Sequence, residues 1–159
     1  MIDVDVIGIR VKVPHNQPIV VLKEHDGNRY LPIWIGIVEA SAIGLAMQGV
    51  DSPRPMTHDL FVQTLATLNG VITGVDIVDL QEGTFFAELF LVSPDGQTHV
   101  IDARPSDAIA LAVRLDIPVR VSETVMDDAS TTIEERDEEE QIEEFKAFLD
   151  QVNPEDFQD

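Results

Sequence analysis

Two arginine-proline pairs, Arg54-Pro55 and Arg104-Pro105, are each closely followed by side chains that can bind phosphate or transfer protons. Each pair places an arginine at the entrance to a predicted helix. The free N–H groups of a helix start, combined with a guanidinium group, form a binding site for an anion. Residues 54–59 and 104–107 therefore predict a phosphate-binding site.

Hydrolysis of a phosphodiester bond needs charge neutralisation on the phosphate, an activated water molecule and a protonated leaving group. Arginines can supply the first, a histidine can transfer protons, and carboxylates can hold a divalent ion, Mg²⁺ or Mn²⁺, that activates water. The candidate catalytic residues are His58, Asp59, Arg104 and Asp107. The candidate substrate-binding residues are Arg54, Arg104 and Ser106. The candidate metal ligands are Glu39, Asp59, Asp102 and Asp107.

Each of these residues also has a purely structural explanation. Acids are favoured in the first turn of any helix, which accounts for Glu39, Asp59 and Asp107 without a catalytic role. Arg104 can pair with an aspartate on either side of it and lock the turn. His58 can be a surface histidine at a helix start. No phosphate-binding loop, paired-histidine metal helix or nucleophile elbow is present to decide between these explanations.

Antiparallel hairpins interleaved with helices indicate an α+β fold with a mixed, mainly antiparallel sheet. The alternation of apolar residues predicts strands, and the turn and cap residues predict helices. Thr57 is the expected N-cap of a helix that buries Leu60, Phe61, Leu65 and Leu68. The expected strands are residues 2–13, 19–22, 71–80, 85–92 and 117–121, with a further strand from the Asp26-Gly27 turn through Trp34 and a short one closed by Val100 and Ile101. The expected helices are residues 36–49, residues 57–68, and one that begins at Pro105 and includes residues 108–112.

The chain shows signs of an internal duplication of a strand-strand-strand-helix unit. The turn at Asp26-Gly27 corresponds to the turn at Asp95-Gly96, and each leads to a strand. The helical sequence at residues 42–46 matches that at 108–112 except that Gly44 is replaced by alanine. A chance likeness between two alanine-rich helices is the alternative.

The charge distribution divides the chain into a domain of residues 1–126 and an acidic extension of residues 127–159. The net charge is −20, and the extension holds 14 acidic and 2 basic residues, a net of −12. Residues 127–132 read as a polar linker, and the rest as an acidic amphipathic helix with its apolar residues on one stripe. An acidic domain is a poor partner for nonspecific binding of nucleic acid. A phosphate substrate must therefore be bound by a few positioned arginines or by a metal ion.

The sequence predicts a cytoplasmic protein. It has no cysteine, so it forms no disulfide bond. No basic segment precedes an apolar run near Met1, so no signal peptide is expected. No apolar stretch approaches the roughly 18 residues that a membrane span needs, so no membrane partner is expected.

Five segments in order resemble the bifunctional nuclease family. They are LPIWIG at 31–36, EA at 39–40, RPMTHDL at 54–60, EGTFFA at 82–87 and DARPSDAIALA at 102–112. The resemblance covers about residues 2–126, and the acidic extension resembles that of bacterial members. It implies an α+β fold with an internal duplication, self-association as a homodimer or higher homo-oligomer, and hydrolysis of both DNA and RNA. It does not supply an agreed catalytic set.

Three functions are consistent with the sequence. The first is a nuclease assisted by a divalent metal ion. The second is a noncatalytic anion- or nucleotide-binding module of a regulatory complex, which suits the acidic surface. The third is an oligomeric structural protein whose motifs only stabilise the fold.

Overall fold

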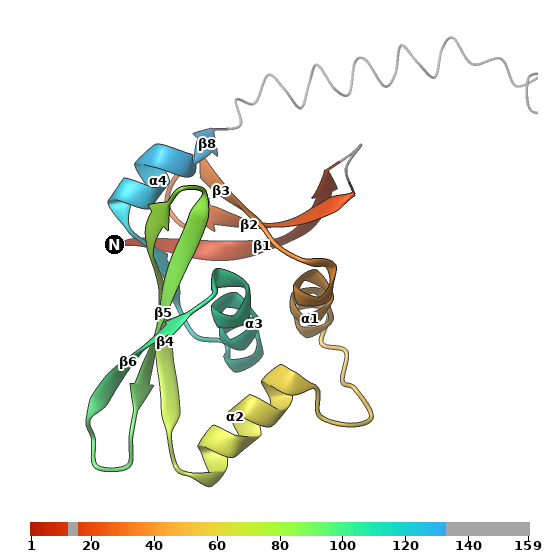
Figure 1. The fold of residues 1–159 in the computed structure, drawn as a ribbon, viewed down its shortest axis with the longest axis vertical. Helices are drawn as coiled ribbons and strands as arrows, with labels where there is room; N and C mark the ends of the chain where they lie inside the picture. Colours follow the sequence, from red (N-terminus) through yellow and green to blue (C-terminus); the bar gives the residue numbers. More distant parts are fainter. Residues whose placement is uncertain (13–15, 133–159) are drawn as a thin grey trace, which may run out of the picture.

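The computed structural model describes residues 1–12 and 16–132 (Figure 1). Its strands are β1 (Ile2–Lys12), β2 (Gln17–Glu24), β3 (Arg29–Trp34), β4 (Val71–Gln81), β5 (Thr84–Val92), β6 (Thr98–Ala103), β7 (Val119–Val121) and β8 (Thr131–Thr132). Its helices are α1 (Ile37–Met47), α2 (Thr57–Thr67), α3 (Pro105–Leu115) and α4 (Glu123–Ala129).

The strands form one sheet of eight in the order β6-β5-β4-β7-β1-β2-β3-β8. Neighbouring strands are antiparallel except β4 and β7, which are parallel. In Figure 1, β1–β3 run across the upper part of the molecule, β4–β6 run down one side, and α1 and α3 occupy the angle between them. The prediction of an α+β fold with a mixed, mainly antiparallel sheet is confirmed.

The order of three antiparallel strands and a helix occurs twice, as β1-β2-β3-α1 and as β4-β5-β6-α3. Strand β7 lies between the two groups and pairs with the first strand of each. This recurrence is the pattern that the sequence predicts. A duplication event as its origin stays a prediction.

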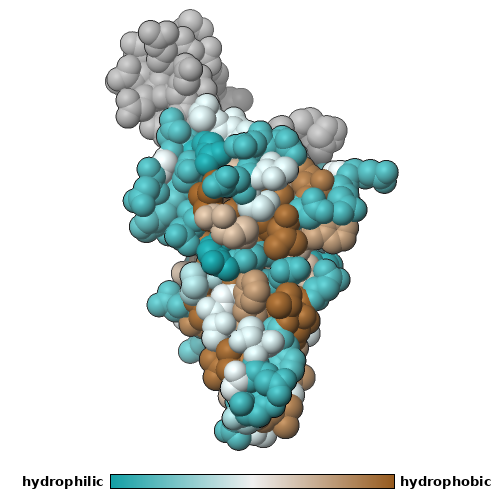
Figure 2. All heavy atoms as spheres, turned by 90° about the vertical axis from the view of Figure 1, so that its left-hand side faces the viewer, coloured by the Kyte–Doolittle hydropathy of each residue, from teal (hydrophilic) through white to brown (hydrophobic). Residues whose placement is uncertain are grey.

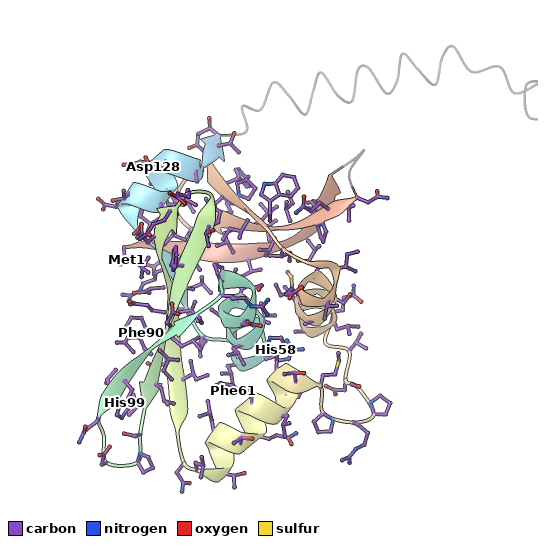
Figure 3. The ribbon with its side chains drawn as sticks, viewed as in Figure 1. Met1, His58, Phe61, Phe90, His99 and Asp128 are labelled. Carbon is purple, nitrogen blue, oxygen red and sulfur yellow. The ribbon has the colours of Figure 1, made fainter. Side chains whose placement is uncertain are left out.

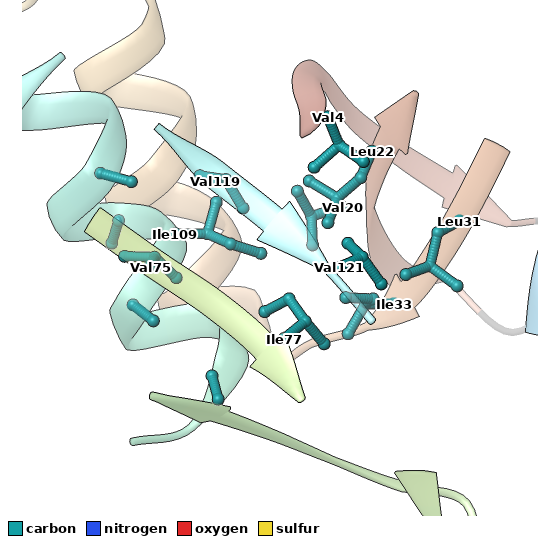
Figure 4. Packing of buried hydrophobic residues seen from close by; sticks show 14 of the residues in the cluster. Val4, Val20, Leu22, Leu31, Ile33, Val75, Ile77, Ile109, Val119 and Val121 are labelled. Atoms are coloured by element: carbon teal, nitrogen blue, oxygen red, sulfur yellow. The ribbon is translucent and has the colours of Figure 1, made fainter. Parts of the chain in front are cut away.

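The hydrophobic core lies where α3 packs against the middle of the sheet. Ile109 of α3, Val75 and Ile77 of β4 and Val121 of β7 have no exposed surface, and Figure 4 shows them together. Full burial of one such side chain contributes about 1.5–3 kcal/mol. Alanines at positions 108, 110 and 112 keep the surface of the helix shallow, so that α3 can approach the sheet closely. This packing holds the start of α3 in a fixed place.

Helix α2 differs from the prediction. None of its residues is buried, and Leu60, Phe61 and Leu68 are exposed, so the predicted buried face is wrong. The reason is that α2 packs beside α3 rather than on the sheet, and only Val62 and Leu65 contribute partly buried contacts to the core. The N-cap is Met56 rather than Thr57, which is the first helical residue.

Large apolar side chains also remain exposed on the strands near α2. Val71 at the start of β4 and Val100 and Ile101 of β6 are among them. Figure 2 shows apolar atoms, in brown, among polar ones on the side of the molecule where β4–β6 lie. These side chains and the exposed apolar residues of α2 all lie on the lower part of the molecule in Figure 1.

Residues 127–132 are not the polar linker that the sequence predicts. Helix α4 continues to Ala129, and Thr131 and Thr132 pair with β3 as strand β8. Sequence analysis missed α4, whose first turn is capped by the Ser122 hydroxyl accepting from the Val125 amide. The predicted acidic helix lies outside the described residues, and independent folding of residues 1–126 stays a prediction. No helix within the described residues has the length and hydropathy needed to cross a membrane.

Candidate functional site

The starts of three helices meet in a cluster of four charged or titratable side chains, which we call the helix-start cluster: Glu39, His58, Arg104 and Asp107. Asp107 Oδ1 lies 3.0 Å from His58 Nε2, and Asp107 Oδ2 accepts from Arg104 Nε at 2.7 Å. Arg104 Nη1 donates to Glu39 Oε1 at 3.0 Å. Figure 3 places His58 between α2 and α3. The cluster therefore joins α1, α2 and α3.

The local sequence explains the position of Arg104 and Asp107. Arg104 is the N-cap of α3, and Pro105 occupies the first turn, where its missing N–H costs nothing. The Arg104 carbonyl accepts from the amides of Asp107 and Ala108, which turns the chain into the helix. This turn brings the Asp107 carboxylate back onto the Arg104 guanidinium.

Glu39 reaches the cluster from the first turn of α1 because the residue before the helix is glycine. A Cβ atom at Gly36 would come within 2.2 Å of Glu39 Oε2, so any side chain there would displace the carboxylate. Gly36 has an ordinary extended conformation. Space for Glu39, rather than backbone freedom, therefore explains this glycine.

The electrostatics of the cluster keep Asp107 ionised. Its burial opposes ionisation, but hydrogen bonds from Arg104 and His58 outweigh burial and lower the pKa of Asp107 below its ordinary value. An ionised carboxylate can only accept hydrogen bonds, so Nε2 of His58 must carry the proton that it shares with Asp107. Nδ1 of a neutral His58 is then an acceptor.

Two groups in the cluster remain available to a ligand. Nδ1 of His58 bonds to no described residue, and every fully enclosed side-chain nitrogen or oxygen in the described part of the chain has a partner, so Nδ1 must reach solvent. Arg104 has five N–H donors, of which its carboxylate partners use two. Its side chain is 64% exposed. A phosphate group can therefore approach both side chains from solvent.

Asp59 belongs to a second, neighbouring pair. Its Oδ1 accepts from Arg114 Nε at 2.8 Å, and its Oδ2 accepts from the Met56 amide at 3.0 Å. The Arg114 bond, with help from the Met56 amide, lowers the pKa of Asp59 against the effect of burial. Sequence analysis missed Arg114. Its place in the last turn of α3, where a basic residue faces the negative end of the helix dipole, was the available signal.

The remaining candidates make no hydrogen bond to the cluster. Asp102 is opposite Glu88 in β5, while the adjacent Ala103 faces the core, so Asp102 points away from α3. Arg54 is exposed in the loop before α2 and bonds to no described residue. Ser106 is buried directly beside Asp107.

The four predicted metal ligands are therefore not gathered together. Among residues 1–12 and 16–132, no three His, Asp or Glu side chains are placed to hold a metal ion. The carboxylates of Glu39 and Asp107 are both in the cluster, but Arg104 bonds to each of them. A preformed metal cage does not fit these residues.

Comparison with known proteins places these residues in a family. The model of the bifunctional nuclease domain matches residues 20–134, which include every candidate site residue. An uncharacterized protein of Mycobacterium tuberculosis is 47% identical over 98% of this chain and 97% of its own length. Bifunctional nuclease 1 of Arabidopsis thaliana is 31% identical over 69% of this chain, and Bifunctional nuclease 1 of Oryza sativa subsp. japonica is 27% identical over 76%.

The matches to the plant proteins cover 34% and 37% of their own length, so the chain spans about a third of these relatives. The family model, by contrast, matches well over half of this chain and includes the whole helix-start cluster. On this evidence the chain belongs to the bifunctional nuclease domain family.

Proposed function

We propose that this protein is a nuclease that hydrolyses phosphodiester bonds of DNA and RNA at the helix-start cluster. The observation that carries the proposal is the bond between His58 and Asp107, two residues 49 positions apart in the chain. Together with Arg104 it puts a proton-transfer group beside a phosphate-binding group. Family membership supports the same substrate class, since the named plant relatives are called bifunctional nucleases.

Each side chain of the cluster has a role in the proposed reaction. The free N–H groups of Arg104 bind the scissile phosphate and stabilise the charge that develops on its oxygens. His58 accepts the proton of the attacking water at Nδ1 as the new bond from water oxygen to phosphorus forms. The bond from phosphorus to the leaving oxygen breaks, that oxygen takes a proton from solvent, and the imidazolium afterwards releases its own proton to solvent. Asp107 fixes the tautomer of His58 through Nε2 and stabilises the imidazolium as it forms. Glu39 holds the other side of the guanidinium and so orients it.

We also propose that activity needs a divalent metal ion, Mg²⁺ or Mn²⁺. With His58 neutral, the cluster has one positive and two negative groups, so it repels a phosphodiester. Mg²⁺ is commonly bound by one or two carboxylates together with substrate phosphates, without a cage made only of protein. Glu39 and Asp107 are the residues that would touch such an ion.

A second candidate function is a noncatalytic anion- or nucleotide-binding module of a regulatory, oligomeric complex. Arg104 is already paired with Glu39 and Asp107, which is the arrangement expected if it has no catalytic role and fixes the turn. Its remaining N–H groups would then bind an anion without hydrolysing it. Substrate turnover distinguishes the two candidates.

The exposed apolar side chains Leu60, Phe61 and Leu68 of α2 support a further part of the proposal, that the protein is a homodimer. Exposed apolar side chains grouped on one element commonly mark surfaces where proteins associate. Closed two-fold assemblies are the commonest homo-oligomers.

The test is hydrolysis of DNA and RNA by wild type, His58→Ala and Arg104→Ala, purified in parallel with two control variants. His99→Ala and Arg10→Ala change the same residue types at exposed sites outside the cluster. We expect the cluster variants to lose at least about 100-fold in rate, because general acid–base catalysis alone contributes about 10²–10⁴-fold. A chelator should abolish the wild-type activity, and Mg²⁺ or Mn²⁺ should restore it.

Parallel purification separates the intrinsic activity from a contaminating nuclease, which would be equally active in all preparations. Equal rates in wild type and in both cluster variants would contradict the assignment of the site. No turnover in any preparation, with nucleotide binding retained, would favour the noncatalytic module.

A further inference from the structure

A cavity lies between the end of α1, the loop that follows it, the first half of α2 and the last turn of α3 (Figure 1). Its volume is about 510 Å³, which is within the range of about 300–1,000 Å³ typical of ligand pockets. No residue of the helix-start cluster lines it. The cavity is therefore separate from the site of the proposed reaction.

Arg114 is the one cationic residue among those that line the cavity. Its side chain is only 11% exposed. Its Nε donates to Asp59, which also lines the cavity, so the guanidinium lies where α2 and α3 face each other across this space.

Most of the hydrogen-bonding capacity of Arg114 is unused. Nε donates to Asp59 and Nη1 to the Ala110 carbonyl, which accounts for two of its five N–H donors. Nη2 bonds to no described residue, and every fully enclosed side-chain nitrogen in the described part of the chain has a partner, so Nη2 must reach open space. A largely buried guanidinium normally has its donors satisfied, and an acceptor from outside the protein would do so here.

The rest of the cavity wall is mixed in polarity. Each of the four segments contributes apolar residues, and Asp51, Ser52 and Gln63 add polar ones. A ligand that fits this wall combines an apolar body with a group that accepts hydrogen bonds from Arg114.

The charges of the wall favour a carboxylate as the accepting group. Arg114 is already paired with Asp59, so a doubly charged phosphate would be poorly compensated by this one cation. A carboxylate carries a single charge, and its two oxygens match two N–H donors of a guanidinium. Asp51 is exposed, so solvent screens its charge from the ligand.

We propose that this cavity binds a small organic carboxylate as a regulatory ligand. The carboxylate accepts from the unused donors of Arg114, and the apolar body lies between α1, α2 and α3. Such a ligand bridges α2 and α3 at the Asp59–Arg114 pair, one residue from His58, and so fixes the helix that carries His58. The regulatory part of this inference rests on the proposed function, whereas the binding part does not.

The experiment titrates the ¹⁵N-labelled full-length protein with phenylacetate and, separately, with phenylacetamide, which has nearly the same shape but no charge. At millimolar phenylacetate, the range for a ligand of about ten non-hydrogen atoms, we expect saturable shifts of the Val50, Val62 and Val113 amides, which belong to three sides of the cavity. Phenylacetamide should bind at least about fivefold more weakly, because hydrogen bonds to a charged acceptor are stronger.

Three results of this titration would overturn the proposal. The first is equal affinity for the two compounds, which would show that the charge is not recognised. The second is a set of shifts confined to the helix-start cluster, which would show that Arg104 binds the carboxylate. The third is no saturable shift with either compound.

Two pairs of variants test the assignment of Arg114 and of the cavity. Arg114→Lys keeps a positive charge beside Asp59 but loses the planar fork, so it should weaken phenylacetate binding at least about fivefold. Arg10→Lys, at an exposed position outside the cavity, should change the affinity less than about twofold.

The second pair leaves the Asp59–Arg114 bond intact. Val50→Asp adds a negative charge in the exposed loop that lines the cavity and should also weaken binding, whereas Val11→Asp, exposed on β1, should not. Equal affinities within either pair would refute the assignment.

Hydrogen exchange separates the regulatory part from the proposed function, because it needs no substrate. At phenylacetate concentrations of about ten times Kd, the α2 amides should exchange about tenfold more slowly, since opening of the helix would release the ligand. The rate of nucleic acid hydrolysis should rise by at least about twofold. Unchanged exchange in α2 would refute the coupling to the helix, and slower exchange with an unchanged rate would refute the regulation alone. Slower exchange in a protein that never turns over nucleic acid would refute the nuclease assignment alone.

Discussion

Helix α2 carries His58 but fully buries none of its own residues, so polar contacts with α3 must add to the partly buried Val62 and Leu65 in holding it. Asp59 is one of two residues that make such contacts: one of its carboxylate oxygens accepts from Arg114 of α3, and the other accepts from the Met56 amide at the start of α2. We therefore predict that Asp59→Ala loosens α2 and displaces His58.

The magnitude follows from the two contacts that are lost. Loss of a side-chain cap costs about 1 kcal/mol. Arg114 is 11% exposed and keeps only a bond to the Ala110 carbonyl, so its charge would be left largely uncompensated. Breaking a fully buried ion pair costs about 3–5 kcal/mol, and we reduce this to about 1–2 because Asp59 is one-third exposed. The free energy of unfolding should fall by about 2–3 kcal/mol, which lowers Tm by roughly 5–10 °C.

The effect should depend on pH with a definite sign. Arg114 and the Met56 amide lower the pKa of Asp59, so the ionised carboxylate is the stabilising form. Its contribution is complete above the ordinary aspartate pKa of about 3.9 and is lost as pH falls through the lower value of the folded state. The difference in stability between wild type and Asp59→Ala should be constant from about pH 7 to 5 and shrink below about pH 4.

Urea unfolding gives the free energy, and hydrogen exchange of the α2 amides shows whether the loosening is local. Gln63→Ala, at an exposed position of the same helix, is the matched control and should change stability by less than about 0.5 kcal/mol. A loss below about 1 kcal/mol for Asp59→Ala, or unchanged exchange in α2, would refute the view that this pair fastens the helix.

Two further predictions concern stability and assembly. Arg120 donates two hydrogen bonds to the buried Asp76. Arg120→Leu should therefore lower the free energy of unfolding, measured in urea, by about 2–3 kcal/mol. The control Arg10→Leu, on the exposed surface, should change it by less than about 0.5 kcal/mol. Equal losses of stability in Arg120→Leu and Arg10→Leu would show that the buried Asp76 carboxylate does not depend on its ion pair with Arg120. The proposed homodimer should sediment at about twice the chain mass of 17.6 kDa at micromolar concentration, and a monomer mass would contradict it.

Local sequence determined the elements and their ends. Pro105 starts α3, and the Asp-Gly pairs at Asp26 and Asp95 stand at turns before strands, as predicted. These features depend on the φ preferences of proline and glycine and on hydrogen bonds between near neighbours. Such effects act over a few residues, so they can be predicted from a single sequence. The mixed, mainly antiparallel sheet followed from the alternation of hairpins and helices.

Only the tertiary structure decided which candidates meet. The packing of α3 between α1 and α2 brings Glu39, His58 and Asp107 around Arg104, whereas the register of β6 with β5 turns Asp102 to the other face. The sequence did not show that the apolar residues of α2 would be exposed. Helical spacing indicates that a helix has an apolar face, but not whether another element covers that face. Which side chains share a surface depends on contacts between residues far apart in the chain, and one sequence does not contain them in a local pattern.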